Sequence, residues 1–250
     1  DSILTAAIQS QRNGTIVKPE IMVPLVTSSG ELEVILQNLE QTAKQTFLRL
    51  GQNIQYKLGT MMEVPRACVQ SRTVAPQVQF MSFDTHDLTQ LTFGFSREDS
   101  GKFLPDYIER QILAFDPFIH LDQQGVGNLI RMALEQSRKV QKKMEYGICG
   151  DHGGDPRSIK FFHRIGIDYV SCSPHLVPVA HLAAAKASIY TTAENSNKPD
   201  RSFSEFIEAD TDCSRLFNEY RFHHTSEHDE LSFLQRGSQR DTMIRQPGQG

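Results

Sequence analysis

Residues 57–87 read KLGTMMEVPRACVQSRTVAPQVQFMSFDTHD, and this stretch decides the fold. It holds two short apolar runs, 58–62 and 78–83, and a carboxylate follows each of them, Glu63 after the first and Asp87 after the second. Apolar runs of this length between turn residues are typical of buried strands. Parallel sheets and barrels bind ligands at the carboxyl ends of their strands. Two acids at that end predict a site for a hard cation, with Mg²⁺ the leading candidate.

The rest of the chain up to residue 188 repeats the same alternation of strand and helix. Three further apolar runs predict strands, at 21–26, 146–149 and 168–172. Between strands the apolar residues recur at helical spacing, most clearly over 32–50, and Ser28 and Glu31 before them form a candidate capping box. This order predicts an α/β domain with a parallel sheet. A closed (β/α)₈ barrel needs eight strands, so three would have to lie upstream of Asp1.

Two polar loops and a polar tail complete the predicted organisation. Residues 84–87 are expected to form a loop at the rim of the sheet, and residues 150–155 (GDHGGD) a glycine-rich loop. Residues 189–250 are polar with few aliphatic side chains, which predicts a partly disordered extension. The chain starts with Asp1 rather than Met, which suggests a piece of a longer protein.

Composition excludes several classes of function. The 250 residues are 38% apolar and 22% charged, as expected for a globular protein, and the formal net charge is −4. This charge gives no strong attraction to nucleic acid or to an anionic membrane. No apolar run approaches the ~20 residues that a membrane-spanning helix needs. The four cysteines are widely spaced and predict neither disulfides nor structural zinc, so a reducing compartment is favoured and the organelle stays open.

Five motifs in register resemble a known enzyme domain. They are PEIMVPLV (19–26), KLGTMMEVPRA (57–67), FMSFDTHDLTQLTFGFSRED (80–99), GICGDHGGDP (147–156) and DYVSCSP (168–174). Together they resemble the C-terminal phosphoenolpyruvate/pyruvate domain of the pyruvate phosphate dikinase family. Phosphoenolpyruvate synthase and enzyme I of the sugar phosphotransferase system share this domain and match less closely. The resemblance covers residues 1–188.

The resemblance implies a fold and a reaction. The family domain is a (β/α)₈ TIM barrel, of which this chain would supply the last five βα units. The family reaction converts ATP, pyruvate and phosphate into AMP, phosphoenolpyruvate and diphosphate. This domain would interconvert pyruvate and phosphoenolpyruvate through an Mg²⁺-stabilised enolate, with a phosphohistidine of another domain as phosphoryl donor. It also implies a homodimer in the full-length protein, and we expect the fragment alone to be inactive.

The resemblance also implies roles for single residues. Glu63 and Asp87 would bind Mg²⁺ and substrate. Cys149 would move the proton at the methyl carbon, and His152 could help to tune this thiol. The family rim loop reads Gly-Thr-Asn-Asp, whereas residues 84–87 read Asp-Thr-His-Asp. The resemblance places Asp84, Thr85 and His86 around the substrate, with Asp84 in place of the family glycine and His86 in place of the asparagine. A side chain in place of the glycine is expected to strain the backbone.

Plainer explanations exist for these residues. An acid at the end of a strand can be a helix cap or a surface charge, and a lone cysteine there is more often a small buried apolar residue, which is our interpretation of Cys172. The alternative function is an inactive truncated barrel that acts as a binding or oligomerisation module. Exposed strand edges and uncovered apolar faces would favour that second function.

Overall fold

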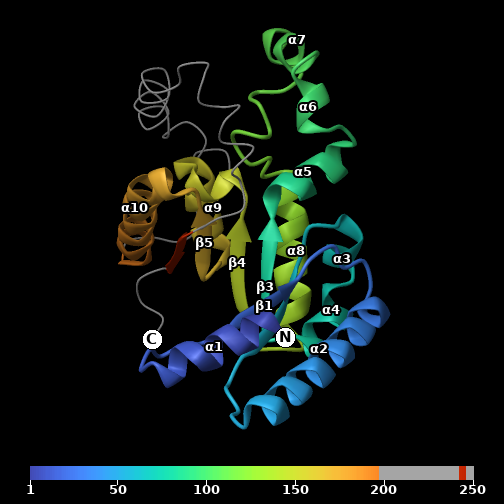
Figure 1. The fold of residues 1–250 in the computed structure, drawn as a ribbon. Helices are drawn as coiled ribbons and strands as arrows, with labels where there is room; N and C mark the ends of the chain where they lie inside the picture. Colours follow the sequence, from blue (N-terminus) through green and yellow to red (C-terminus); the bar gives the residue numbers. More distant parts are fainter. Residues whose placement is uncertain (197–241, 246–250) are drawn as a thin grey trace, which may run out of the picture.

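Six strands form one open sheet in the computed structural model, which describes residues 1–196 and 242–245 (Figure 1). The first five strands pair in parallel in the order in which they occur along the chain, as the sequence predicts. They are β1 (Glu20–Val23), β2 (Lys57–Met61), β3 (Phe80–Asp84), β4 (Glu145–Cys149) and β5 (Tyr169–Cys172). The domain is therefore an α/β domain with five consecutive parallel βα units.

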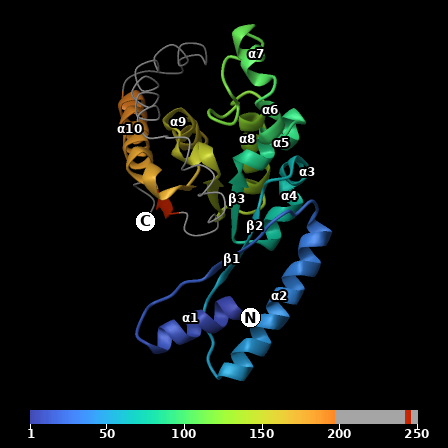
Figure 2. The same cartoon turned by 45° about the horizontal axis from the view of Figure 1, so that its top comes forward.

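Helices alternate with the strands, and those that contribute to the main hydrophobic core cover one face of the sheet. The long ones are α1 (Ser2–Arg12), α2 (Ser29–Leu50), α8 (Val126–Arg138), α9 (Pro156–Ile165) and α10 (Val177–Ser196). Shorter ones are α3 (Pro65–Val69), α4 (Ser71–Val74), α5 (Thr85–Phe93), α6 (Arg97–Ser100), α7 (Leu104–Glu109) and the 3₁₀ turns η1 (Ala75–Gln77), η2 (Asp151–Gly154) and η3 (Pro174–Leu176). Figure 2 shows α1 and α2 next to each other on the β1 side of the sheet. None of the helices in the described part of the chain has the length and apolarity that a bilayer span requires.

The sixth strand was not predicted. We predicted no strand at the end of the chain, where β6 (Thr242–Arg245) pairs antiparallel with β5. The segment TMIR holds only two apolar residues, too few to show a period. The edge of β5 supplies the hydrogen-bond partners that such a short strand needs. Likewise α10 continues to Ser196, past the predicted tail boundary at residue 188.

Local sequence explains where the first elements begin and end. The apolar run at 21–26 is longer than β1 because Pro24 lacks an N–H and Leu25 has a φ of 57°, outside the strand region. At the start of α2, Ser28 Oγ accepts the Glu31 N–H at 3.3 Å, as the capping box predicts. The Glu31 carboxylate reaches back one residue further than expected, to the N–H and hydroxyl of Thr27, each at 2.8 Å.

The strand registers divide the side chains into two faces. One face packs on the helices and belongs to the main hydrophobic core, with Leu58, Met81, Phe83, Tyr146, Ile148, Val170 and Cys172. The registers place Phe80, Ser82 and Asp84 of β3 on the opposite face, together with Glu145, Gly147 and Cys149 of β4. Cys172 therefore lies in the core, as we expected. Asp84 and Cys149 instead share the inner face of the sheet.

Two glycines give the inner face room for aromatic rings. Gly59 pairs with Phe80, and Gly147 pairs with Tyr169. A Cβ atom at Gly59 would lie 2.4 Å from the Phe80 ring, and one at Gly147 would lie 2.1 Å from the Tyr169 ring. Tyr169 is buried, and burial raises the pKa of its phenol to about 12. Each ring thus occupies the place of the missing side chain on the neighbouring strand.

Replacing Gly147 with Ala is expected to lower the free energy of unfolding by about 2 kcal/mol, since overpacking a rigid interior forces side chains and backbone to shift. Gly30→Ala is the matched control, because a Cβ atom at this position in the first turn of α2 meets nothing within 4 Å. The control is expected to be neutral or stabilising by up to ~1 kcal/mol. Urea unfolding followed by circular dichroism measures both. Equal stability of the two variants would contradict this packing.

Charged residues at the amino ends of the strands form a separate cluster. The Lys57 ammonium lies 2.8 Å from both Glu20 and Glu145. The hydrogen bond to Glu145 is the main cause that raises the pKa of Lys57. This cluster joins β1, β2 and β4 at the end of the sheet where barrel proteins concentrate stability rather than chemistry.

Candidate active site

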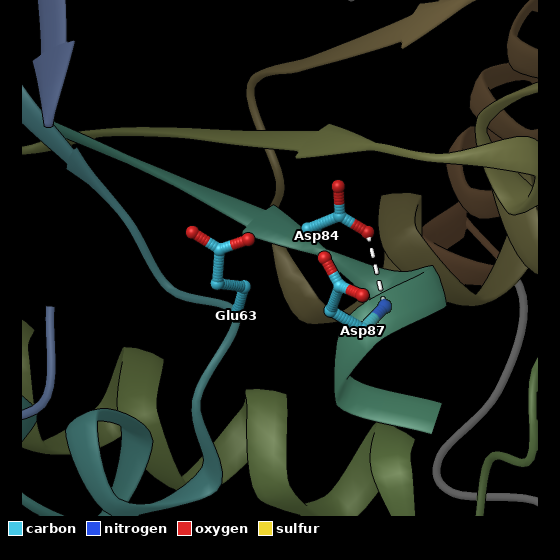
Figure 3. Close-up of side chains that lie close together, drawn as sticks. All are labelled: Glu63, Asp84 and Asp87. Atoms are coloured by element: carbon cyan, nitrogen blue, oxygen red, sulfur yellow. Dashed lines mark hydrogen bonds between the residues drawn. The ribbon is translucent and has the colours of Figure 1, made fainter. Parts of the chain in front are cut away.

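Three carboxylates meet at the carboxyl end of the sheet (Figure 3). Glu63 follows β2, Asp84 ends β3, and Asp87 lies in the first turn of α5. One oxygen of each lies within 4.8 Å of the others. The structure thus brings together Glu63 and Asp87, the predicted metal ligands, and adds Asp84, which we expected only near the substrate. We call these three residues the acid cluster.

Glu63 is the most buried member of the acid cluster, with 4% of its surface exposed. Its Oε1 atom accepts a hydrogen bond from the Leu25 N–H. The left-handed backbone of Leu25, unusual for a leucine, accompanies this bond. Burial raises the pKa of Glu63, the Leu25 bond opposes this shift, and the nearby Asp87 and Asp84 raise the pKa further. A bound cation would relieve the cost of holding these charges together.

Asp84 is the N-cap of a helix. We expected residues 84–87 to form a loop, but Thr85 begins α5, and Asp84 Oδ1 accepts the N–H groups of His86 at 2.9 Å and Asp87 at 3.2 Å. The expected strain is also absent, because Asp84 has φ −83° and ψ 104°, which suit any residue. An aspartate directly before a helical pattern is a standard N-cap signal, and it could have identified this role.

Cys149 joins the acid cluster through Asp84. It ends β4 directly opposite Asp84, and its Sγ atom lies 3.6 Å from Asp84 Oδ2. The residue is 8% exposed. The thiol therefore has a proton acceptor beside it at the inner rim of the sheet. Cys68 differs, because burial raises the pKa of its thiol to about 12 and leaves it unreactive. Cys213 lies outside the described residues.

Thr85 links Cys149 to a buried histidine. The Thr85 hydroxyl lies 3.1 Å from the Cys149 carbonyl oxygen and 2.8 Å from His152 Nδ1. His152 Nε2 lies 2.9 Å from the Pro117 carbonyl oxygen. We expected His152 to act on the Cys149 thiol, but both ring nitrogens are engaged elsewhere. His152 instead holds the Thr85 side chain, whose hydroxyl donates to the Cys149 carbonyl oxygen.

Burial lowers the pKa of His152, and the bond to the Pro117 carbonyl opposes this shift. In the neutral ring Nε2 donates to the Pro117 carbonyl oxygen. The unfolded chain, with a pKa near 6.5, takes up a proton first as the pH falls. The stability that neutral His152 contributes is therefore complete above pH 6.5 and is lost below it.

We therefore expect protonation of His152 in the unfolded chain to lower the free energy of unfolding by about 1 kcal/mol for each pH unit below 6.5. Urea unfolding between pH 7.5 and 5.5 measures the slope. His152→Gln should flatten it, whereas replacing the exposed His181 with Gln should leave it as in the wild type. A His152→Gln slope equal to that of the wild type would refute the assignment.

The glycine-rich loop packs against protein. Gly150 has a φ of 97°, and a Cβ atom there would lie 3.0 Å from the Thr85 hydroxyl oxygen. A Cβ atom at Gly153 would lie 2.3 Å from the Ser171 carbonyl oxygen. These glycines thus allow close contacts of the loop with α5 and β5. His86 packs on Phe118, with 5.5 Å between ring centroids, and is not part of the acid cluster.

The acid cluster fits a hard divalent cation. It offers only carboxylate oxygens, the ligands that Mg²⁺ prefers, and Mg²⁺ usually takes the rest of its six ligands from water and substrate oxygens. A pKa of Glu63 raised by burial and by its neighbours is the expected state of such a site before a cation enters.

Comparisons with known proteins agree with the motifs. A family model described as PEP-utilising enzyme, PEP-binding domain, matches residues 2–189. The chain is 50% identical over 188 residues to pyruvate, phosphate dikinase 1, chloroplastic, of Arabidopsis thaliana, covering 75% of this chain and 20% of that protein. It is 50% identical to the pyruvate, phosphate dikinase of Giardia intestinalis (75% and 21% covered) and 46% identical to that of Clostridium symbiosum (75% and 22% covered).

The chain spans about a fifth of the length of these curated relatives. Among solved structures, a citrate lyase from Burkholderia xenovorans aligns at 15% identity over 74% of this chain and 57% of that chain, with a TM-score of 0.41. The family match covers most of the chain, and the five motifs fall within it. The chain belongs to the family of PEP-utilising enzymes and carries their PEP-binding domain.

Proposed function

We propose that this chain is the metal-binding and proton-transferring part of a domain that interconverts pyruvate and phosphoenolpyruvate. In the complete protein the activity would be that of a pyruvate, phosphate dikinase, and a phosphohistidine on another domain would carry the phosphoryl group. The observation that supports this proposal is the convergence of Glu63, Asp84, Asp87 and Cys149 at one rim. Identity of about 50% to enzymes of that name supports it further.

Each residue has a distinct task in this proposal. Glu63 and Asp87, with Asp84, would hold Mg²⁺, which supplies a Lewis acid for the oxygens of the substrate. The Cys149 thiol would give a proton to the substrate methylene carbon when phosphoenolpyruvate becomes pyruvate, and the thiolate would take a methyl proton in the reverse direction. Asp84, whose Oδ2 atom lies 3.6 Å from the Cys149 Sγ atom, would accept the thiol proton when the thiolate forms. Thr85 would orient the rim backbone through His152 and Cys149.

Calorimetric titration of the 250-residue chain with Mg²⁺ and then oxalate tests the binding part of the proposal. Oxalate carries two adjacent carboxylates and resembles the enolate of pyruvate in charge and shape. We expect saturable oxalate binding with Mg²⁺ and none in EDTA. A folded chain that binds no oxalate in the presence of Mg²⁺ would overturn the proposal.

A test of the catalytic part of the proposal requires a longer protein. The chain should be inactive alone and should support pyruvate-dependent ATP consumption when the preceding part of a related dikinase is joined to its start. The absence of turnover in a folded, Mg²⁺-binding fusion would count against the enzymatic function.

A second candidate is a binding or oligomerisation module. Among the described residues β1 pairs only with β2, so its outer edge offers free backbone groups to another chain. Stable oligomers in sedimentation velocity, together with no Mg²⁺-dependent oxalate binding, would favour this candidate. In the complete enzyme we propose a homodimer.

A further inference from the structure

A cavity of about 330 Å³ lies between the connection that follows α7 and the beginning of α9. Its volume lies in the range of small-molecule sites. Most of its wall is apolar, formed by Phe93, Ile112, Leu113, Phe115, Pro117 and Leu121. The acid cluster contributes nothing to this wall, so the cavity is separate from the site described above.

The single acid in the wall is already engaged. Asp122 Oδ1 accepts the Gln124 N–H at 3.1 Å, and its Oδ2 accepts the Gly125 N–H at 3.0 Å. Ser158 is engaged too, since its Oγ atom accepts the Leu121 N–H at 3.1 Å and donates to Asp155. These groups shape the wall.

Arg157 brings a cation to the same wall. Its guanidinium carbon lies 5.4 Å from the centroid of the Phe115 ring. Within residues 1–190, where side chains are described, no carboxylate forms an ion pair with Arg157. A guanidinium stacked on an aromatic wall keeps its hydrogen-bond donors for an acid group that enters beside the ring.

His120 is the second basic group, and a buried acid orients it. Its Nδ1 atom lies 3.1 Å from Asp155 Oδ1, and Asp155 is only 3% exposed. Burial alone would raise the pKa of Asp155, but the hydrogen bonds from His120 and Ser158 lower it, so the carboxylate is ionised. His120 Nδ1 therefore carries the proton that faces Asp155, and in the neutral ring Nε2 is a hydrogen-bond acceptor, so Arg157 is the group in this wall that pairs with an anion.

We propose that this cavity is a second binding site, for a small organic anion with an apolar body, whose acid group pairs with Arg157. The apolar wall selects the body, and the Arg157 guanidinium, which has no carboxylate partner among the described side chains, selects the charge. The acid cluster differs from this cavity, because its three carboxylates repel an anion unless a divalent cation is bound. Dependence on Mg²⁺ therefore distinguishes the two sites.

The test uses 2-naphthoate as the anion and 2-naphthalenemethanol as its neutral counterpart, both titrated into the 250-residue chain in EDTA. Ligand-observed saturation-transfer NMR gives the dissociation constants. We expect saturable binding of both compounds, with 2-naphthoate about tenfold tighter because of its charge-assisted bond to Arg157. Arg157→Gln should remove this preference and leave binding of the alcohol unchanged.

Two further variants complete the design. Arg131→Gln, on the exposed surface of α8, is the matched control and should keep the tenfold preference. Phe115→Ala should weaken the binding of both compounds, because it removes part of the apolar wall. The proposal is wrong if neither compound binds a folded chain, if Arg157→Gln keeps the preference, or if 2-naphthoate binds only with Mg²⁺. The last result would place the anion at the acid cluster.

Discussion

Glu63→Gln is expected to weaken Mg²⁺-dependent oxalate binding at least ~100-fold, a larger loss than is typical for residues that only support metal ligands. The substitution removes one negative charge from the acid cluster and keeps an oxygen that can accept the Leu25 N–H. Glu63 is almost fully buried, so water cannot easily replace the lost ligand. Calorimetry with Mg²⁺ and oxalate measures the effect.

Without Mg²⁺ the Glu63→Gln variant should be more stable than the wild type. Three carboxylates within 4.8 Å repel one another, and a neutral amide relieves part of this repulsion. Thermal unfolding should therefore show a higher Tm for Glu63→Gln than for the wild type in EDTA, and little further increase on adding Mg²⁺. Glu33→Gln, on the exposed face of α2, is the control and should behave as the wild type. Unchanged oxalate affinity in Glu63→Gln would exclude Glu63 as a ligand.

Cys149→Ala is expected to slow exchange of the pyruvate methyl protons with solvent by about 10³-fold, the effect typical of losing a general acid or base. The assay needs the chain joined to the preceding part of a related dikinase, and NMR in D₂O follows the exchange. Mg²⁺ and oxalate affinities should stay near wild type, because the thiol contacts the acid cluster only through Asp84.

Cys172→Ala is the matched control for this variant. Cys172 ends the neighbouring strand β5 and is buried on the helix side of the sheet. Its loss should cost about 1 kcal/mol of stability through a small cavity and leave the exchange rate unchanged. Equal exchange rates in Cys149→Ala and in the wild type would show that another group moves the proton.

Much of the fold was predictable because each strand carries its own signal. The five apolar runs fall at β1 to β5, and the order of elements is enough to expect a parallel sheet. Glu63 and Asp87 could be placed at one rim because both follow strands. These inferences need only local patterns and the geometry of parallel strands.

The missed features depend on contacts between distant segments. Asp84 joins the acid cluster because α5 begins immediately after β3, and although the N-cap signal gives this helix start, it does not give the contact with Glu63. His152 turns to Thr85 and Pro117, which lie 67 and 35 residues away in the chain. The four residues of β6 gain their regularity from the edge of β5. Local propensity carries no information on such partners.

The position of β6 bears on how a complete barrel could assemble. In a closed eight-stranded barrel the last strand pairs with the first, and if β5 is that last strand, its outer edge is the seam where the ring closes. Here β6 occupies that seam and runs antiparallel to β5. Closing a ring at this edge would require an incoming strand to displace β6, so β6 and that strand would compete for a single docking position.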